Sequence, residues 1–313
     1  ATLCDNEIIA EYYTDRESIQ RIIDECFTMD IHCVAHFSQS DIAGLLSAGY
    51  KVPDHFLIDD TILILSLLDE NRQSYGLKKL AKDLYGIEMD EYKEAASGGL
   101  DSPRFMKYGK LDVMVELKIF CDFYEQLVES PAYDLYRNHL MPSIRTFADL
   151  MQTGCIWDIK HGHDMYLKIV PRIQDLEKRI YSKIGKLNLG STQQLANRLF
   201  RDLGYSSDGL TVSRKTGKVS LDKKNLEALA KRHKVCRDII TWRSLNKMLS
   251  TYLSPYMNRM VSCGKVTGMY SLHSDTGRTR CSGENLQNVP TGFKNPDMKD
   301  LVIRDGFIAR PGK

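Results

Sequence analysis

Apolar residues recur at helical spacing along most of the first 130 residues, and this pattern predicts a mainly helical region. Ile19, Ile22, Ile23 and Cys26 illustrate the spacing, because they fall on one face of a helix. A short apolar run at 31–34 predicts a buried strand. The predicted helices lie at 18–26, 41–50, 60–68, 77–85 and 105–129, the last one ended by Ser130-Pro131.

The rest of the chain carries the same helical pattern in longer stretches. Ser191 and Gln194 form a capping box, with the Ser bonding forward and the Gln bonding back, and this box begins a helix that extends to Leu203. Further helices are predicted at 164–184, 221–233 and 235–260.

Three segments of this second part break the helical pattern. We expect a hairpin at 210–220 around Thr216-Gly217, a strand-like segment at 265–273, and a polar loop from Thr276 onward.

Charge divides the chain into two parts of opposite sign. Residues 1–140 hold 13 Lys and Arg against 26 Asp and Glu, whereas residues 141–313 hold 30 against 15. A basic part of this size suggests a polyanionic partner, with nucleic acid as the first candidate, although charge scattered over solvated helices stays the alternative. Because the sign changes near Pro131 to Pro142, we predict a domain boundary there, with domains at 1–135 and 136–313.

The composition argues against a membrane or secreted protein. No run approaches the roughly 20 apolar residues of a membrane helix, and the longest, Ile62 to Leu68, is interrupted by Ser66. The chain starts with neither a signal peptide nor Met, which suggests that it begins inside a longer protein. The eight cysteines are scattered without C-x-x-C spacing, as expected of reduced thiols. We therefore expect a cytoplasmic monomer with no membrane partner, and an organelle stays open.

Three polar segments in the second part carry the most specific information. They are Leu187-Asn-Leu-Gly-Ser-Thr-Gln-Gln-Leu195, Arg243-x-x-x-Lys247-x-x-Ser250-Thr-Tyr252, and Thr276-Gly-Arg278 followed by Asn285-Leu-Gln-Asn-Val-Pro290. In this order and spacing they resemble the thumb and palm motifs of family A (DNA polymerase I-type) polymerases. The resemblance covers the chain from about Met141 to its end. It implies a mainly α-helical thumb that runs into the start of an α+β palm, in a DNA-directed DNA polymerase that uses Mg²⁺ and deoxynucleoside triphosphates.

The polar side chains in these motifs suit a protein that holds any DNA sequence. In the minor groove every base pair offers acceptors at purine N3 or pyrimidine O2, and Arg, Asn and Gln side chains can donate to them. The resemblance implies that Arg278, Asn285, Gln287 and Asn288 lie along the minor groove beside the primer terminus of primer–template DNA. A plain polar turn before Pro290 is the alternative. By the same resemblance, the residues that hold the DNA backbone are Asn188, Ser191, Thr192, Arg243 and Lys247.

The first part contains a second, looser set of motifs. They are His36-x-x-x-x-Asp41, Asp60-Thr61, Tyr75-Gly-Leu-x-x-Leu80-Ala81 and Tyr108-x-x-x-Asp112. They resemble the later motifs of the 3′–5′ proofreading exonuclease attached to such polymerases, which implies an α/β ribonuclease H-like domain and two-metal hydrolysis. The resemblance assigns Mg²⁺ binding to Asp41 and Asp112, and orientation of the attacking water to Tyr108. Spacing of i, i+4 places Tyr108 and Asp112 on one helix face, and Asp41 as a helix N-cap is the alternative.

Two departures from the family pattern concern the substrate contacts and the ends of the chain. The family usually has His-Asn and Phe-Asp where this chain has His36-Phe37 and Ser40-Asp41. Its first exonuclease motif is D-x-E on a strand, but Asp5-Asn-Glu7 lies too close to Asp41, so we expect that strand to be missing. In the family, a phrase like 307–313 leads into the strand that bears the palm metal-binding Asp. We therefore expect this chain not to polymerise alone.

Two other functions account for part of the sequence. A stand-alone 3′–5′ exonuclease followed by a basic nucleic-acid-binding domain explains residues 1–140 equally well, but not 276–290. A non-catalytic helical adaptor that binds an acidic protein through its basic part explains the charge alone.

Overall fold

The chain folds into two compact units, which we describe from a computed structural model. The structure describes residues 2–4, 7–28, 33–54, 58–212, 217, 219–274, 276–292 and 298–309. Unit 1 comprises residues 1–154 and 267–283, and unit 2 comprises residues 155–266 and 284–313. Packing thus divides the chain after Gly154, whereas the boundary that we predicted after residue 135 falls within the helices of unit 1. That predicted boundary between functional domains stays a prediction.

Unit 1 is mostly helical, with short two-stranded pairs. The strands β3 and β4 are parallel, with Cys33 opposite Ile58, and helix α2 connects them. In chain order the elements of unit 1 are β1 (Thr2–Cys4), β2 (Glu7–Ile9), α1 (Arg16–Thr28), β3 (Cys33–Ala35), α2 (Ser38–Ser47), β4 (Ile58–Asp60), α3 (Thr61–Leu68), α4 (Leu77–Tyr85), α5 (Tyr92–Ala95), η1 (Ala96–Gly98), α6 (Pro103–Val128), α7 (Tyr133–Leu135), η2 (Tyr136–Leu140), α8 (Met141–Thr153), β6 (Gly268–Ser271) and β7 (Arg280–Gly283).

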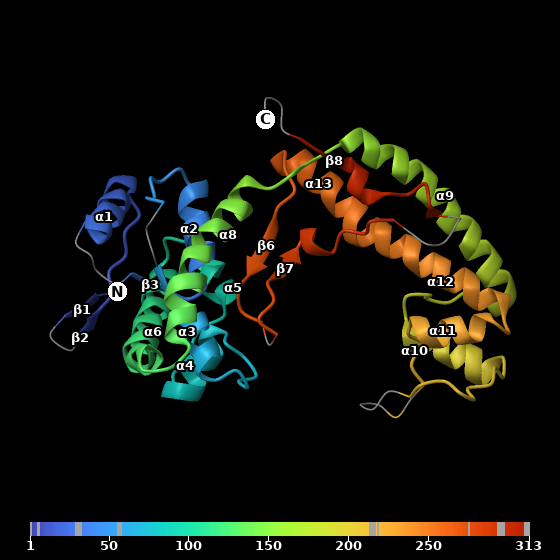
Figure 1. The fold of residues 1–313 in the computed structure, drawn as a ribbon, viewed down its shortest axis with the longest axis horizontal. Helices are drawn as coiled ribbons and strands as arrows, with labels where there is room; N and C mark the ends of the chain where they lie inside the picture. The colour runs from blue at the N-terminus through green and yellow to red at the C-terminus, as the bar shows by residue number, and fades with distance from the viewer. Residues whose placement is uncertain are drawn as a thin grey trace. The chain divides into compact units, whose positions relative to one another are not determined.

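Unit 2 is built around two long helices, α9 and α12, which run side by side (Figure 1). Residues 234–263 form one helical run in which η4 is π-helical. The elements of unit 2 are β5 (Ile156–Trp157), α9 (Ile159–Ile184), α10 (Thr192–Ala196), η3 (Asn197–Asp202), α11 (Lys223–Ala230), α12 (Lys234–Lys247), η4 (Met248–Leu253), α13 (Ser254–Cys263), η5 (Leu286–Asn288), η7 (Ile303–Gly306) and β8 (Phe307–Ile308).

The helices follow the predicted pattern closely. Helix α4 has the predicted bounds, and Gly86 ends it at φ 68°, a left-handed conformation that glycine adopts without a Cβ clash. The predicted helices at 18–26 and 105–129 are present as α1 and α6. In contrast, the capping box is only half formed. Ser191 Oγ accepts from the Gln194 N–H at 3.3 Å, but Gln194 Oε1 accepts from the Asn188 N–H at 3.1 Å instead of reaching back to Ser191.

The strands differ more from the prediction. Strand β7 lies where we expected an irregular loop, and it pairs with β6, with Tyr270 opposite Cys281. Val212 and Val219 form the expected antiparallel bridge of the hairpin, whereas its tip around Thr216 and the residues 31–32 of the predicted strand lie outside the described residues.

A buried tryptophan joins two parts of unit 2 that are distant in sequence. Trp157 is fully buried, and its indole Nε1–H donates to the Ile303 carbonyl oxygen at 3.1 Å. Strand β5 also pairs with β8 in an antiparallel register that places Trp157 opposite Phe307. Gly162 and Gly306 pack against the indole ring so closely that a Cβ on either would lie less than 3.0 Å from it. The two ends of unit 2 are therefore joined through one side chain.

Each unit has its own hydrophobic core. Unit 1 buries Ile42, Ile64, Leu127, Tyr136 and Met141 in one cluster, and Leu80, Val115 and Ile119 in a second. Unit 2 buries one large cluster along α9 and α12. Within the described residues no helix is long and apolar enough to cross a membrane, and the cysteines whose side chains are described are free thiols.

Candidate functional site

An open pocket of about 480 Å³ in unit 1 gathers the residues of the Tyr-x-x-x-Asp motif. Tyr108, Asp112 and Glu116 follow one another at one-turn intervals on helix α6, so their side chains share one face. His36 and Lys78 line the same pocket. The structure thus brings together two predicted residues, Tyr108 and Asp112, and adds Glu116, which we did not predict.

The carboxylates of this pocket are held in a form that resists ionisation. Burial, together with the nearby charges of Asp41 and Asp112, raises the pKa of Glu116 to about 8. Burial also raises the pKa of Asp112, although a hydrogen bond from Tyr108 opposes that change. Burial and the charge of Asp112 raise the pKa of Tyr108 to about 12, so its phenol stays protonated at neutral pH. Carboxylates are therefore crowded together here, and the nearby charge of Lys78 only partly offsets the effect of burial on the pKa of Asp112.

Asp41 lies in the first turn of α2, close enough to these carboxylates to interact with them. Although its side chain reaches solvent, dense protein around it and the charge of Asp60 raise the pKa of Asp41 to about 6. It does not cap α2, because the N-cap residue is Phe37. Phe37 has φ 77°, which is the only positive φ of a non-glycine residue in the described part of the chain.

Asp60, from the same set of motifs, has a structural role. Its Oδ1 accepts from the Ile62 and Leu63 N–H groups at the start of α3. Its Oδ2 accepts from the backbone N–H and the hydroxyl of Ser38, at 2.7 and 2.9 Å. Asp60 therefore ties the start of α2 to the start of α3 and positions Asp41 near the pocket.

A metal site at this pocket would have three nearby carboxylates as candidate ligands. Asp41, Asp112 and Glu116 are oxygen donors of the kind that divalent cations prefer. Within the described residues, however, no three His, Cys, Asp or Glu side chains lie close enough together to hold a metal ion. The assignment of Mg²⁺ binding to Asp41 and Asp112 stays a prediction.

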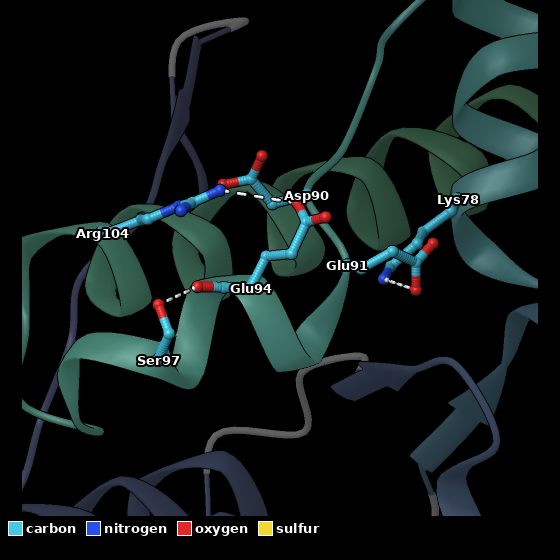
Figure 2. A network of polar contacts seen from close by, with 6 residues as sticks. All are labelled: Lys78, Asp90, Glu91, Glu94, Ser97 and Arg104. Atoms are coloured by element: carbon cyan, nitrogen blue, oxygen red, sulfur yellow. Dashed lines mark hydrogen bonds and ion pairs between the residues drawn. The ribbon is translucent and has the colours of Figure 1, made fainter.

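A network of polar contacts includes Lys78, which lines this pocket (Figure 2). Lys78 of α4 pairs with Glu91 at 3.0 Å and also lies over the Tyr108 ring, with Nζ 5.5 Å from the ring centroid. Arg104, near the start of α6, donates to Asp90 at 2.8 Å and lies 3.6 Å from Glu94. These pairs join the segment 90–94 to both α4 and α6, and so they keep Lys78 beside Tyr108.

The polar turn at 285–288 in unit 2 is held by two tyrosines. Asn285 Oδ1 accepts from the N–H groups of Gln287 and Asn288, both at 3.1 Å, so it caps the short helix η5. The Tyr252 hydroxyl donates to the Asn288 carbonyl oxygen at 2.8 Å, and the Tyr256 hydroxyl donates to that of Asn285 at 3.5 Å. The turn is thereby fixed to η4 and α13, while the Gln287 and Asn288 residues stay exposed.

The residues of unit 2 that are predicted to hold the DNA backbone differ in the exposure and the hydrogen bonds of their side chains. Thr192 and Lys247 are exposed. Asn188 Oδ1 accepts from the Gly190 N–H at 2.9 Å, and Ser191 caps α10. The Arg243 guanidinium is half-buried and donates to the Leu221 carbonyl oxygen at 2.7 Å, and burial lowers its pKa. Arg243 thus has a structural role, and its contact with the DNA backbone stays a prediction.

Arg278 lies in the connection between β6 and β7, and its side chain is exposed. Its carbonyl oxygen accepts from the Ser274 hydroxyl at 2.5 Å, which closes the turn. Packing places Arg278 in unit 1 and Asn285 to Asn288 in unit 2, and their common role in the minor groove stays a prediction.

Comparison with known proteins shows the family to which the chain belongs. Residues 161–313 match the model of DNA polymerase family A. The chain is 29% identical over 295 residues to the DNA polymerase I of Chloroflexus aurantiacus, 30% over 268 residues to that of Rhizobium leguminosarum, and 33% over 181 residues to the thermostable enzyme of Thermus aquaticus. These alignments cover 89%, 81% and 57% of this chain but only 30%, 26% and 21% of the relatives. The chain belongs to DNA polymerase family A, and it spans less than a third of the length of these relatives.

A solved structure shares the fold. The POL domain of Pol1 from M. smegmatis, in complex with a DNA primer-template and dNTP, matches with a TM-score of 0.74 at 20% identity. The match covers 95% of this chain and 48% of the other. The predicted polymerase fold is thus confirmed, and the chain is mostly helical, whereas the predicted α/β exonuclease domain stays a prediction.

Proposed function

We propose that this chain is the primer–template-binding part of a DNA-directed DNA polymerase. The observation that carries the proposal is the polar turn 285–288, which lies within the region that matches family A and is fixed to η4 and α13 by Tyr252 and Tyr256. Unit 2 has 27 Lys and Arg against 13 Asp and Glu, which suits a polyanionic partner. Deoxynucleoside triphosphates and Mg²⁺ are the substrates and cofactor that we propose for the whole polymerase.

The test is binding of a fluorescent primer–template to the full chain across a salt series. We expect affinity to fall steeply with salt, with about −0.9 in the log–log slope for each phosphate neutralised, and we expect a preference for the primer junction over single strands. Absent binding by a folded chain would reject the proposal and favour the helical adaptor.

The role of Arg278 is tested with a matched pair of variants. Arg278→Ala should reduce the discrimination between matched and mismatched primer ends, because its donors are proposed to contact the minor-groove acceptors. Arg280→Ala removes the same charge two residues away and is the control. Equal discrimination by both variants and by the unchanged chain would exclude the assigned role.

We further propose that residues 1–135 are an α/β domain of the ribonuclease H-like, 3′–5′ exonuclease type. Support comes from the parallel strands β3 and β4, which are joined through α2, and from the pocket that contains Tyr108 and Asp112. Asp112→Asn keeps the size of the side chain and removes its charge. Because the strand with the first exonuclease motif is expected to be missing, we expect little loss of 3′ nucleotides from a labelled primer, and a loss that Asp112→Asn abolishes would show an active exonuclease. DNA binding without any loss of nucleotides would contradict an active exonuclease.

A further inference from the structure

A second pocket, of about 440 Å³, lies in unit 2 where the C-terminal part of α9 meets the start of α12. None of the residues assigned to DNA binding lines it. Its charged and aromatic lining residues are Arg179, Lys183, Tyr205, Arg232, His233, Lys234 and Asp238.

The charge of this pocket is predominantly positive. Four cations from two helices and the turn between α11 and α12 face a single carboxylate, Asp238, which pairs with Arg179 at 3.2 Å. Lys183, Arg232 and Lys234 are exposed. Cations gathered around one hollow repel one another unless an anion occupies it, so the pocket favours an anionic ligand.

The backbone of the pocket adds to this preference. Helix α12 has 14 residues, and no side chain caps its first turn, because the N-cap residue His233 makes no such hydrogen bond. The pocket is lined by His233 and by the first two helical residues, Lys234 and Val235. The start of a helix presents unpaired N–H groups and the positive end of the helix dipole, which together suit a phosphate.

The pocket has a rigid frame. The ring of Tyr205 is stacked on that of His233, with centroids 3.6 Å apart and planes 7° from parallel. Val235 and Cys236 at the start of α12 are buried in the unit 2 core, and so are Ile180 and Ile184 of α9. Arg179, Lys183 and Lys234 are thus mounted on helices that the core fixes, and Arg232 lies in the turn between two such helices, so the backbone that carries these cations is already positioned for a ligand.

We propose that this pocket binds a phosphate group of the DNA, at a point separate from the thumb and palm motifs. The same chemistry also fits a free phosphate compound such as pyrophosphate. The choice of DNA as the ligand therefore rests on the proposed function. Proteins bind phosphate groups through Lys and Arg side chains and through the N–H groups at helix starts. The phosphodiester is favoured because unit 2 as a whole is basic and belongs to a polymerase family.

The experiment compares two double variants of the full chain. Lys183→Ala with Arg232→Ala removes two cations from the pocket. Lys178→Ala with Lys223→Ala removes two exposed cations of the same unit that do not line it. Primer–template affinity is measured across a salt series, and inorganic pyrophosphate is titrated by calorimetry. Circular dichroism confirms that each variant is folded.

The expected result is a loss of about tenfold in DNA affinity at low salt, and a log–log salt slope that is shallower by about 0.9, in the pocket variant relative to the control. The pocket variant could instead bind DNA as tightly as the control and lose the saturable pyrophosphate binding of the unaltered chain. That result would assign the site to free phosphate. If neither ligand depends on Lys183 and Arg232, the proposal is overturned while DNA binding by the chain stands. If the unaltered chain binds no DNA, the proposed function fails and the pyrophosphate titration alone decides.

A third variant should strengthen phosphate binding instead of weakening it. Asp238→Asn removes the carboxylate and frees Arg179, so phosphate binding should become several-fold tighter. Weaker or equal binding by Asp238→Asn would contradict a phosphate in this pocket.

Discussion

The two units of this chain treat charge in opposite ways. Unit 1 has 16 Lys and Arg against 28 Asp and Glu, and it turns carboxylates toward one another around a pocket. Unit 2 has the reverse balance and leaves its Lys and Arg mostly on the surface, where they stay hydrated. The difference teaches that net charge alone does not locate a site. The candidate site of unit 1 is defined by a few carboxylates with raised pKa values, whereas the proposed DNA-binding surface of unit 2 is defined by many exposed cations.

The largest effect is expected where unit 2 is packed most closely. Gly162→Ala should destabilise the protein by about 3 kcal/mol, because its Cβ would overlap the Trp157 ring in a fully packed site. Gly44→Ala in α2 is the matched control in unit 1, since nothing lies within 4 Å of its Cβ, and it should gain about 1 kcal/mol of helix propensity. Thermal and urea unfolding measure both. Equal effects would show that the two helices are packed alike.

The next effect concerns pH and unit 1. Glu116 has an ordinary pKa of 4.5 and about 8 in the fold, so the folded state keeps a proton that the unfolded state loses. Stability should therefore fall as pH rises from about 4.5 to 8. Glu116→Gln should remove much of this slope and stabilise the protein at pH 8 by on the order of 2 kcal/mol. Glu125→Gln, exposed on the same helix, is the control, and an unchanged slope in Glu116→Gln would show that Glu116 is not the group responsible.

Arg243 and Lys247 sharpen the comparison within unit 2. Arg243→Ala should weaken DNA binding and also lower the free energy of unfolding by about 1.5 kcal/mol, because it leaves the Leu221 carbonyl oxygen without its charged donor. Lys247→Ala removes an exposed cation and should change the DNA affinity alone. Unfolding in urea and salt-dependent binding separate the two effects, and equal stability of both variants would contradict a structural role for Arg243.

The smallest effect is expected at Phe37. Its left-handed backbone is unfavourable for an aromatic side chain, and Asn tolerates it better. Phe37→Asn should therefore stabilise unit 1 by about 1 kcal/mol, whereas Phe37→Ala, which removes the ring and keeps the penalty, should not. Chemical denaturation of both variants measures the difference. If neither variant gains stability, the backbone of Phe37 is not strained.

Helices were predictable because their signals are local. The spacing of apolar residues and the stop at Gly86 define α4, and Ser130-Pro131 follows directly on the end of α6. The capping box shows the limit of such reasoning. Gln194 has the expected residue type, but the chain before Ser191 turns so that the Asn188 N–H is the nearer donor.

Strands and units were less predictable because their partners are distant in sequence. Strand β5 pairs with β8 about 150 residues later, and each has only two residues, too few for a period of two to be seen. Likewise, nothing local indicates that residues 267–283 pack with residues 1–154.

Most of the candidate site was predictable from motifs, except one carboxylate. Tyr108 and Asp112 line one pocket as the i, i+4 spacing predicts, and the next turn of the same helix carries Glu116. The extended spacing Tyr-x-x-x-Asp-x-x-x-Glu was a visible signal, but only the fold shows that Asp41 lies close enough to act on it.

The pairing of Trp157 with residues 303–307 has a consequence for the order in which the chain folds during synthesis. Trp157 is made early in unit 2, yet its hydrogen-bond acceptor Ile303 and its close neighbour Gly306 are made almost 150 residues later. Contacts of such separation close slowly, since loop entropy must be overcome first. Unit 1 has the same property, because β6 and β7 are made after α13. A growing chain therefore presents two incomplete cores at once, and a stop placed before residue 298 should leave the indole of Trp157 open to solvent and to chaperones.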